Sequence, residues 1–195
     1  MRNAIKNKIK ILTALLVAFV LSMTMFGFTL FVGERAGAVS KGAELVSAIE
    51  AAPADYLTTT RIVIGTEGED SAEDNGQVIT IESTDTDTES VTVPSGTRIV
   101  FSAVAPSAKN ELEGNAIYSR IIFNVPLIVE AEAEVVFDVD VEFNAAVTVN
   151  GTMELGGIAR NRGAFTVSNK EDSYADIQSR GLIVSGSFNN DAAQG

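Results

Sequence analysis

Residues 130–143 read EAEAEVVFDVDVEF, and their side chains alternate between apolar and acidic over almost the whole stretch. Odd positions hold Ala, Val or Phe, even positions hold Glu or Asp, and only Val136 breaks the alternation. Because successive side chains of an extended chain point to opposite faces, a period of two predicts a β-strand with one buried and one solvated, anionic face. The stretch therefore predicts the class of architecture and leaves the chemistry of the protein open.

A strand of this kind cannot be stable alone. Its five large inward side chains each contribute about 1.5–3 kcal/mol when fully buried. Ordering the backbone costs about 1–2 kcal/mol for every residue, and the stretch has fourteen. Neighbouring strands and a shared core must supply the difference.

The chain on both sides of this stretch predicts more strands and one helix. Short apolar segments punctuated by Gly, Asn or Pro predict strands at 61–65, 78–81, 91–93, 98–101, 120–123, 126–129, 147–149, 152–155, 164–167 and 181–184. Residues 43–52 (AELVSAIEAA) predict a helix, with Ser40 as a cap at its start and Pro53 after its end. Many short strands and a single convincing helix indicate an all-β protein.

An 18-residue repeat runs through the second half of the chain. It is visible in the series Val129, Val147, Phe165 and Ile183. A repeat of about this length in strand-and-turn sequence is typical of one coil of a β-solenoid.

The same segments resemble a known family. AELVSAIEAAP, followed by SVTVPSGTRIVF at 90–101, looks like the start of a pectate-lyase-like right-handed parallel β-helix, in which an N-terminal helix caps the first coil. AAVTVNGTMELGG and GLIVSGSFNND resemble rungs of secreted and surface-attached bacterial β-helix proteins. The resemblance implies such a domain over residues 39–195, with capping helix 43–52 and acidic loops in 66–90. An antiparallel β-sandwich is the alternative, because Asn150-Gly151 is a strong hairpin signal.

The N-terminus predicts export. Basic residues are followed by an uncharged run at 11–33 and by the small-residue motif Ala36-Gly37-Ala38. These features indicate a signal peptide over residues 1–38, cleaved after Ala38, or an uncleaved anchor whose residues 11–33 span the membrane. We therefore expect the protein to be secreted or to lie on the extracellular face of the cell envelope.

Composition excludes several functions. Removing residues 1–38 removes five of the 14 basic residues and one of the 26 acids, which leaves a formal charge of −16. Such a surface repels nucleic acid and anionic lipid. The chain has no cysteine and no histidine, so disulfides, thiolate metal sites, histidine zinc ligands and histidine general bases are all excluded.

Calcium is the one ion for which the sequence offers a candidate loop, at residues 71–82. Gly76 stands at loop position 6 and Glu82 at position 12, as in an EF-hand, while Glu73 and Asn75 supply oxygens at positions 3 and 5. Position 1 is Ser where the motif has Asp, and no helix is predicted on either side. These departures favour a solvated acidic loop over a calcium site.

The acids at 130–142 are a second candidate for a calcium site, and a solvated acidic face is the alternative. Positions 18 residues further on carry no acid that would complete a set of ligands, and Arg160 falls beside Glu142. We therefore expect one exposed ion pair and otherwise a solvated face that discourages sheet-to-sheet aggregation.

Two function classes remain. We expect an exported, non-enzymatic structural or adhesive surface module that binds a glycan or another extracellular partner along a solenoid face. Because solenoid ends need covering, we expect either end-to-end association or natural truncation of a longer surface protein. The alternative is a calcium-assisted polysaccharide lyase, or a degenerate remnant of one, because β-helix lyases use acids to hold calcium and an arginine as base. The residues considered for that alternative are Arg160, Arg162, Arg180, Asp172 and Asp176.

Overall fold

The computed structural model describes residues 34–39, 41–68, 72–87, 89–167, 175–179 and 181–190. The chain divides into two units, residues 1–32 and 33–195, and every described residue belongs to the second. Most of the predicted export segment lies outside the described residues. The last residues of the predicted export segment belong to β1 (Glu34–Val39), which pairs in parallel with β2 (Thr59–Ile64). The predicted cleavage after Ala38 therefore falls inside β1.

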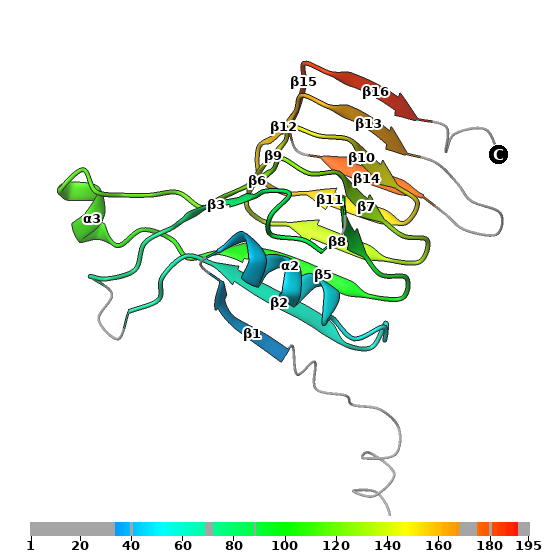
Figure 1. Ribbon diagram of the computed structural model, residues 1–195. Coiled ribbons are helices and arrows are strands. Elements are labelled where there is room, and N and C mark those ends of the chain that lie inside the picture. Colours follow the sequence, from blue (N-terminus) through cyan, green and yellow to red (C-terminus); the bar gives the residue numbers. More distant parts are fainter. Residues whose placement is uncertain are drawn as a thin grey trace, which may run out of the picture. The chain divides into compact units, whose positions relative to one another are not determined.

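Three parallel sheets make up the described part of this second unit (Figure 1). The first sheet contains β1, β2, β5 (Arg98–Ala103), β8 (Glu134–Phe137), β11 (Thr152–Leu155) and β14 (Asp176–Ser179). The second sheet contains β3 (Val78–Ile81), β6 (Arg120–Phe123), β9 (Asp140–Phe143), β12 (Ala159–Asn161) and β15 (Leu182–Val184). The third sheet contains β4 (Val91–Val93), β7 (Leu127–Val129), β10 (Val147–Val149), β13 (Ala164–Val167) and β16 (Ser187–Asn190).

The chain visits the three sheets in the same order in every coil. β2, β3 and β4 form the first coil, and β14, β15 and β16 form the fifth. The predicted parallel β-helix is therefore confirmed, and the antiparallel sandwich is wrong. β10 and β11, on either side of Asn150-Gly151, lie in different sheets, so this dipeptide makes a corner of the solenoid and not a hairpin.

Inward side chains from successive coils stack to form the core. The rings of Phe101 and Phe137 are stacked with centroids 4.8 Å apart, and those of Phe123 and Phe143 with centroids 5.6 Å apart. Phe137 also meets both rings of the second pair edge-on, at 6.2 and 6.0 Å. These contacts join the first and second sheets through the middle of the solenoid.

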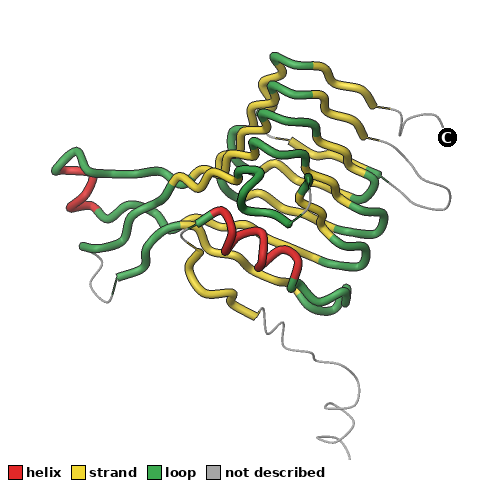
Figure 2. Tube along the Cα trace, viewed as in Figure 1, coloured by secondary structure: helices red, strands yellow, loops and turns green. Residues whose placement is uncertain are grey.

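One helix closes the N-terminal end of this core. Helix α2 (Gly42–Glu50) lies at the end of the stack that bears β1 and packs against β3 and β4 (Figure 2). Its face of Leu45, Val46 and Ile49 is buried, so the predicted capping helix is confirmed within two residues at its C-terminal end. The N-cap residue is Lys41, whose side chain makes no cap hydrogen bond, and the predicted cap Ser40 lies outside the described residues.

The stretch 130–143 is two strands and a turn, not one continuous strand. Glu132 adopts a left-handed conformation with φ of 64°, and β8 begins only after this turn. From Ala133 to Phe143 every odd-numbered side chain is buried, as the alternation predicted. Glu142 is also buried, at 7% exposure, so the acidic side of the stretch is not uniformly solvated.

A side chain from the segment between α2 and β2 contacts the turn at Glu132. The hydroxyl of Tyr56 donates a hydrogen bond to the carbonyl oxygen of Glu132. Partial desolvation raises the pKa of the half-exposed Tyr56, and the negative charges of Glu132 and Glu134 raise it further. The neutral hydroxyl that donates this bond is therefore the favoured form.

The register is less regular than an 18-residue repeat predicts. Val147 does pair with Phe165, but Val129 pairs with Val149, and Ile183 pairs with Arg160 in the second sheet. The reason is that the turns differ in length from coil to coil, so residues that are always 18 positions apart in the sequence do not always pair in the sheets.

Candidate functional site

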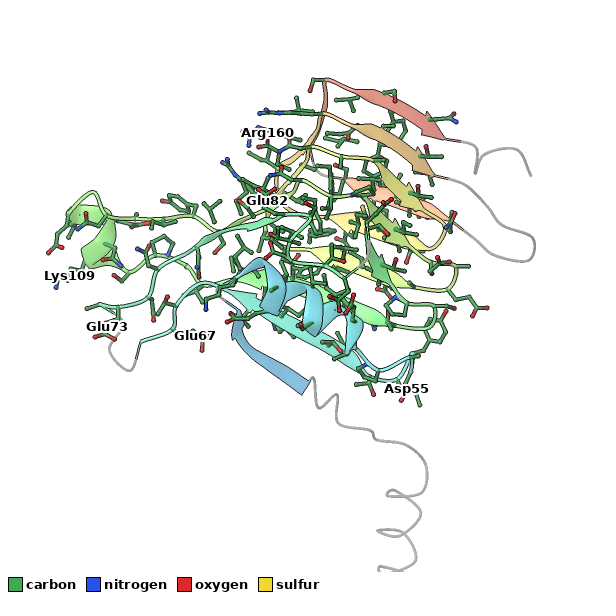
Figure 3. All side chains as sticks on the ribbon, in the orientation of Figure 1. Asp55, Glu67, Glu73, Glu82, Lys109 and Arg160 are labelled. Atoms are coloured by element: carbon green, nitrogen blue, oxygen red, sulfur yellow. The ribbon has the colours of Figure 1, made fainter. Side chains whose placement is uncertain are left out.

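Two insertions leave the regular coils and lie side by side. The first follows β2 and comprises residues 65–77, and the second follows β5 and comprises residues 104–119. We call their described residues the arm. Figure 3 shows Glu67, Glu73 and Lys109 together on this projection, away from the stacked strands.

Hydrogen bonds between the two insertions give the arm a defined structure. The side chain of Asn75 accepts from the backbone N–H of Ile117 at 2.7 Å and donates to the carbonyl of Asn115 at 3.1 Å. The carbonyl of Asp74 accepts from the backbone N–H of Ser107 and from Nδ2 of Asn110, both at 2.8 Å. The two loops therefore fold as one unit.

The arm contains a short helix that the sequence interpretation missed. The sequence predicts no helix between the strands at 98–101 and 120–123, but α3 (Ala108–Leu112) forms one turn there. Ser107 is its N-cap and accepts from the backbone N–H of Asn110 at 3.2 Å. A serine directly before Ala-Lys-Asn-Glu-Leu was the available signal, although five residues are too few for periodicity to show.

A groove of about 390 Å³ lies where the arm meets the coils. It spans three successive coils. Its walls come from the second insertion, from the corner between β8 and β9, and from the corner between β11 and β12 in the next coil. Its lining residues are Ala103, Val104, Ala105, Pro106, Glu111, Tyr118, Ser119, Asp138, Val139, Asp140 and Gly157.

The groove combines an aromatic wall with carboxylates. Tyr118 is 68% exposed, and its hydroxyl donates to Oε1 of Glu111 at 3.3 Å. Oδ1 of Asp140 accepts from the backbone N–H of Ile158 at 2.9 Å, which orients that carboxylate at the corner, and Asp138 beside it is exposed. Hydroxyl or ammonium donors of a ligand would find acceptors here, beside an apolar ring face.

The structure does not bring the three predicted calcium ligands together. Glu73 lies on the arm and Glu82 lies at the far end of β3 (Figure 3). The four residues of β3 alone span about 13 Å, whereas Ca²⁺ ligands lie at about 2.3–2.6 Å from the ion. The oxygen of the Asn75 amide accepts from Ile117, and Oε1 of Glu82 accepts from Nδ2 of Asn124 at 2.6 Å. Among the described residues no group of three or more acids is placed to hold a metal ion.

We therefore expect millimolar calcium to leave the melting temperature unchanged. A calcium ion bound only to the folded chain at 100 times its dissociation constant would add about 2.7 kcal/mol of stability, which a thermal melt detects readily. A parallel magnesium titration controls for ionic strength. A calcium-specific rise that Glu82→Gln abolishes would restore the loop hypothesis.

Glu142 forms its ion pair with a different arginine from the one that the sequence predicted. Arg160 does lie beside Glu142 in register, but the ion pair is between Nη2 of Arg162 and Oε1 of Glu142, at 3.0 Å. Arg162 reaches back from the turn after β12, and this side chain is 60% exposed while that of Glu142 is 9% exposed.

The residues considered for a lyase are not gathered at one place. Arg160 lies on the second sheet and Asp176 on the first. Arg180 and Asp172 lie outside the described residues.

Comparison with protein-family models, with curated proteins and with solved structures finds no match for this chain. In the described part of the chain, neither helix has the length and apolar character needed to cross a membrane.

Proposed function

We propose that the protein is an exported, non-enzymatic surface module that binds a glycan in the groove at the base of the arm. The observation that carries this proposal is the pairing of an exposed tyrosine ring with carboxylates in one concave site. Sugars present apolar C–H faces that pack on aromatic rings and hydroxyl groups that donate to carboxylates. A groove of this composition matches both properties.

The position of the groove also supports recognition of a polymer. Asp138 and Asp140 stand at a corner between two strands of the solenoid, so the coils hold their backbone in place. The hydrogen bonds of Asn75 fix the arm opposite them. A preformed site loses little conformational entropy when a ligand binds.

Charge selects among glycans. The chain has a formal charge of −12, and Glu111, Asp138 and Asp140 all line the groove. Polyuronates are anionic and are repelled by such a site, whereas neutral sugars are tolerated and amino sugars are attracted. We therefore expect binding of neutral or amino-sugar oligomers and none of polygalacturonate.

Titration calorimetry with oligomers of glucose, mannose and glucosamine tests the proposal. Tyr118→Ala is expected to weaken binding at least tenfold, because it removes the ring on which the sugar packs. Asp138→Asn is expected to weaken the binding of an amino-sugar oligomer more than the binding of a neutral one. Leu112→Ala is the matched control, since Leu112 lies on the same arm, is 89% exposed and does not line the groove.

Two outcomes would contradict the proposal. If none of these oligomers binds, or if Tyr118→Ala binds as well as the natural chain, the groove is not a glycan site. If products of chain cleavage accumulate, the protein is an enzyme. No observation favours the lyase alternative, because Arg160 and Asp176 lie on different sheets.

A further inference from the structure

Four outward residues form a row across the second sheet, beside the groove. Val78, Arg120 and Asp140 are register partners on β3, β6 and β9, and the backbone N–H of Ile158 in the next coil donates to Asp140. Val78 is 48% exposed and Ile158 is 47% exposed, while Arg120 and Asp140 are half-buried. The row therefore presents a guanidinium and a carboxylate side by side, with an apolar side chain at each end.

Arg120 and Asp140 are neighbours in this row but do not form an ion pair. In the described part of the chain the Arg120 side chain makes no hydrogen bond and no ion pair, and its Nε is buried. Asp140 is held from the other side, because its Oδ1 accepts from the backbone N–H of Ile158 in the following coil. Since Arg120 is partly exposed, a ligand can supply the acceptor that its guanidinium lacks.

The row adjoins the aromatic wall of the groove. Tyr118 precedes Arg120 by two residues and lines the groove together with Asp140. A substituent of a sugar ring packed on Tyr118 can therefore reach Asp140, and Arg120 is the register partner of Asp140 on the neighbouring strand, about 4.8 Å away. A substituent that both donates and accepts hydrogen bonds would bind the two side chains at once.

We propose, on the basis of the glycan function above, that the groove selects N-acetylated amino sugars. An acetamido group has one N–H, which donates to the carboxylate of Asp140, and one carbonyl oxygen, which accepts from the guanidinium of Arg120. Both hydrogen bonds involve a charged side chain and are stronger than those between neutral groups. The exposed side chains of Val78 and Ile158 provide apolar surface for the methyl group.

A ligand carboxylate is a poorer match for Arg120 than an amide carbonyl. Glu111, Asp138 and Asp140 all line the groove, so a ligand meets three carboxylates and one guanidinium beside them. An anionic group on the ligand would be repelled, whereas the carbonyl of an acetamido group is a neutral acceptor.

Titration calorimetry of the full chain with tetramers of N-acetylglucosamine, glucosamine and glucose tests this selectivity. The N-acetylglucosamine tetramer is expected to bind at least about tenfold more tightly than the glucose tetramer, because the acetamido group adds two charge-assisted hydrogen bonds. Arg120→Met keeps an unbranched side chain but removes every donor. It is expected to weaken N-acetylglucosamine binding at least about tenfold, to leave glucose binding within about twofold, and to strengthen glucosamine binding because a positive charge is lost. A purely structural loss would weaken all three ligands alike.

Arg160→Met is the matched control. Arg160 also lies outward and half-buried on the second sheet, but its register partners are Glu142 and Ile183, outside the row. Its replacement is expected to change none of the three affinities. Arg120→Lys, which keeps a cationic donor without the planar guanidinium, is expected to retain part of the preference for the N-acetylated tetramer.

Two results would overturn the acetamido assignment and leave the glycan site in place. One is equal affinity of the natural chain for the N-acetylglucosamine and glucose tetramers, and the other is an equal loss of all three ligands in Arg120→Met. The first comparison needs no variant, so it is decisive even if Arg120→Met does not fold. Failure of every tetramer to bind would overturn the proposed function, and the acetamido assignment with it.

Discussion

Phe137→Ala is expected to lower the free energy of unfolding by about 3–5 kcal/mol, the usual cost of deleting a buried phenylalanine side chain. Phe137 is fully buried and touches three other rings: it stacks on Phe101 at 4.8 Å and meets Phe123 and Phe143 edge-on. Its removal opens a cavity between the first and second sheets, in the middle coil of five. Urea unfolding followed by circular dichroism measures the loss.

Tyr118→Ala is the control for this loss. It deletes an aromatic side chain of similar size that is 68% exposed, and such surface changes stay within about 0.5 kcal/mol. An equal effect of the two variants would mean that the rings of the core do not form the stack described above. The same measurement also shows whether Tyr118→Ala is folded when its glycan binding is tested.

The alternation of apolar residues predicted the core because it depends only on local geometry. Val135, Phe137, Val141 and Phe143 face inward as expected, since a parallel coil keeps one face of every strand in the core. The capping helix was predictable for the same reason, because the spacing of its apolar residues and the proline after it lie within a dozen residues of sequence.

The turn at residues 130–133 was not predictable from the same pattern. Glu and Ala continue the alternation through the turn, so periodicity gives no signal where the chain bends. Glu132 nevertheless adopts a left-handed conformation there, with φ of 64°.

The groove depends on contacts that are distant in the sequence. Asn75 fixes the backbone of Ile117, 42 residues away, and the stacking of coils makes Tyr118 and Asp138 line the same groove. The calcium motif depends on a distant arrangement as well, because Glu73 and Glu82 are close in sequence but β3 extends between them.

Gly151→Ala is expected to destabilise the protein by about 3 kcal/mol, at the upper end of the range for overpacking. A Cβ at this position would lie 2.5 Å from the carbonyl oxygen of Glu130 and closer still to that of Ala133. Both obstacles are backbone atoms of the preceding coil, so no side chain can move aside to relieve the contact. The expected result is a lower midpoint of urea unfolding with an unchanged slope.

Gly181→Ala separates this steric cost from a general effect of replacing glycine. Gly181 also lies in a turn of the solenoid, but a Cβ there would meet no atom within 4 Å. Its replacement is expected to be neutral or to stabilise by up to about 1 kcal/mol, because alanine restricts the unfolded chain. If Gly151→Ala proved as mild as Gly181→Ala, the coils would not approach as closely as the corner at Asn150-Gly151 requires. That result would reopen the hairpin that this dipeptide suggested, since a two-residue turn projecting into solvent has room for a Cβ.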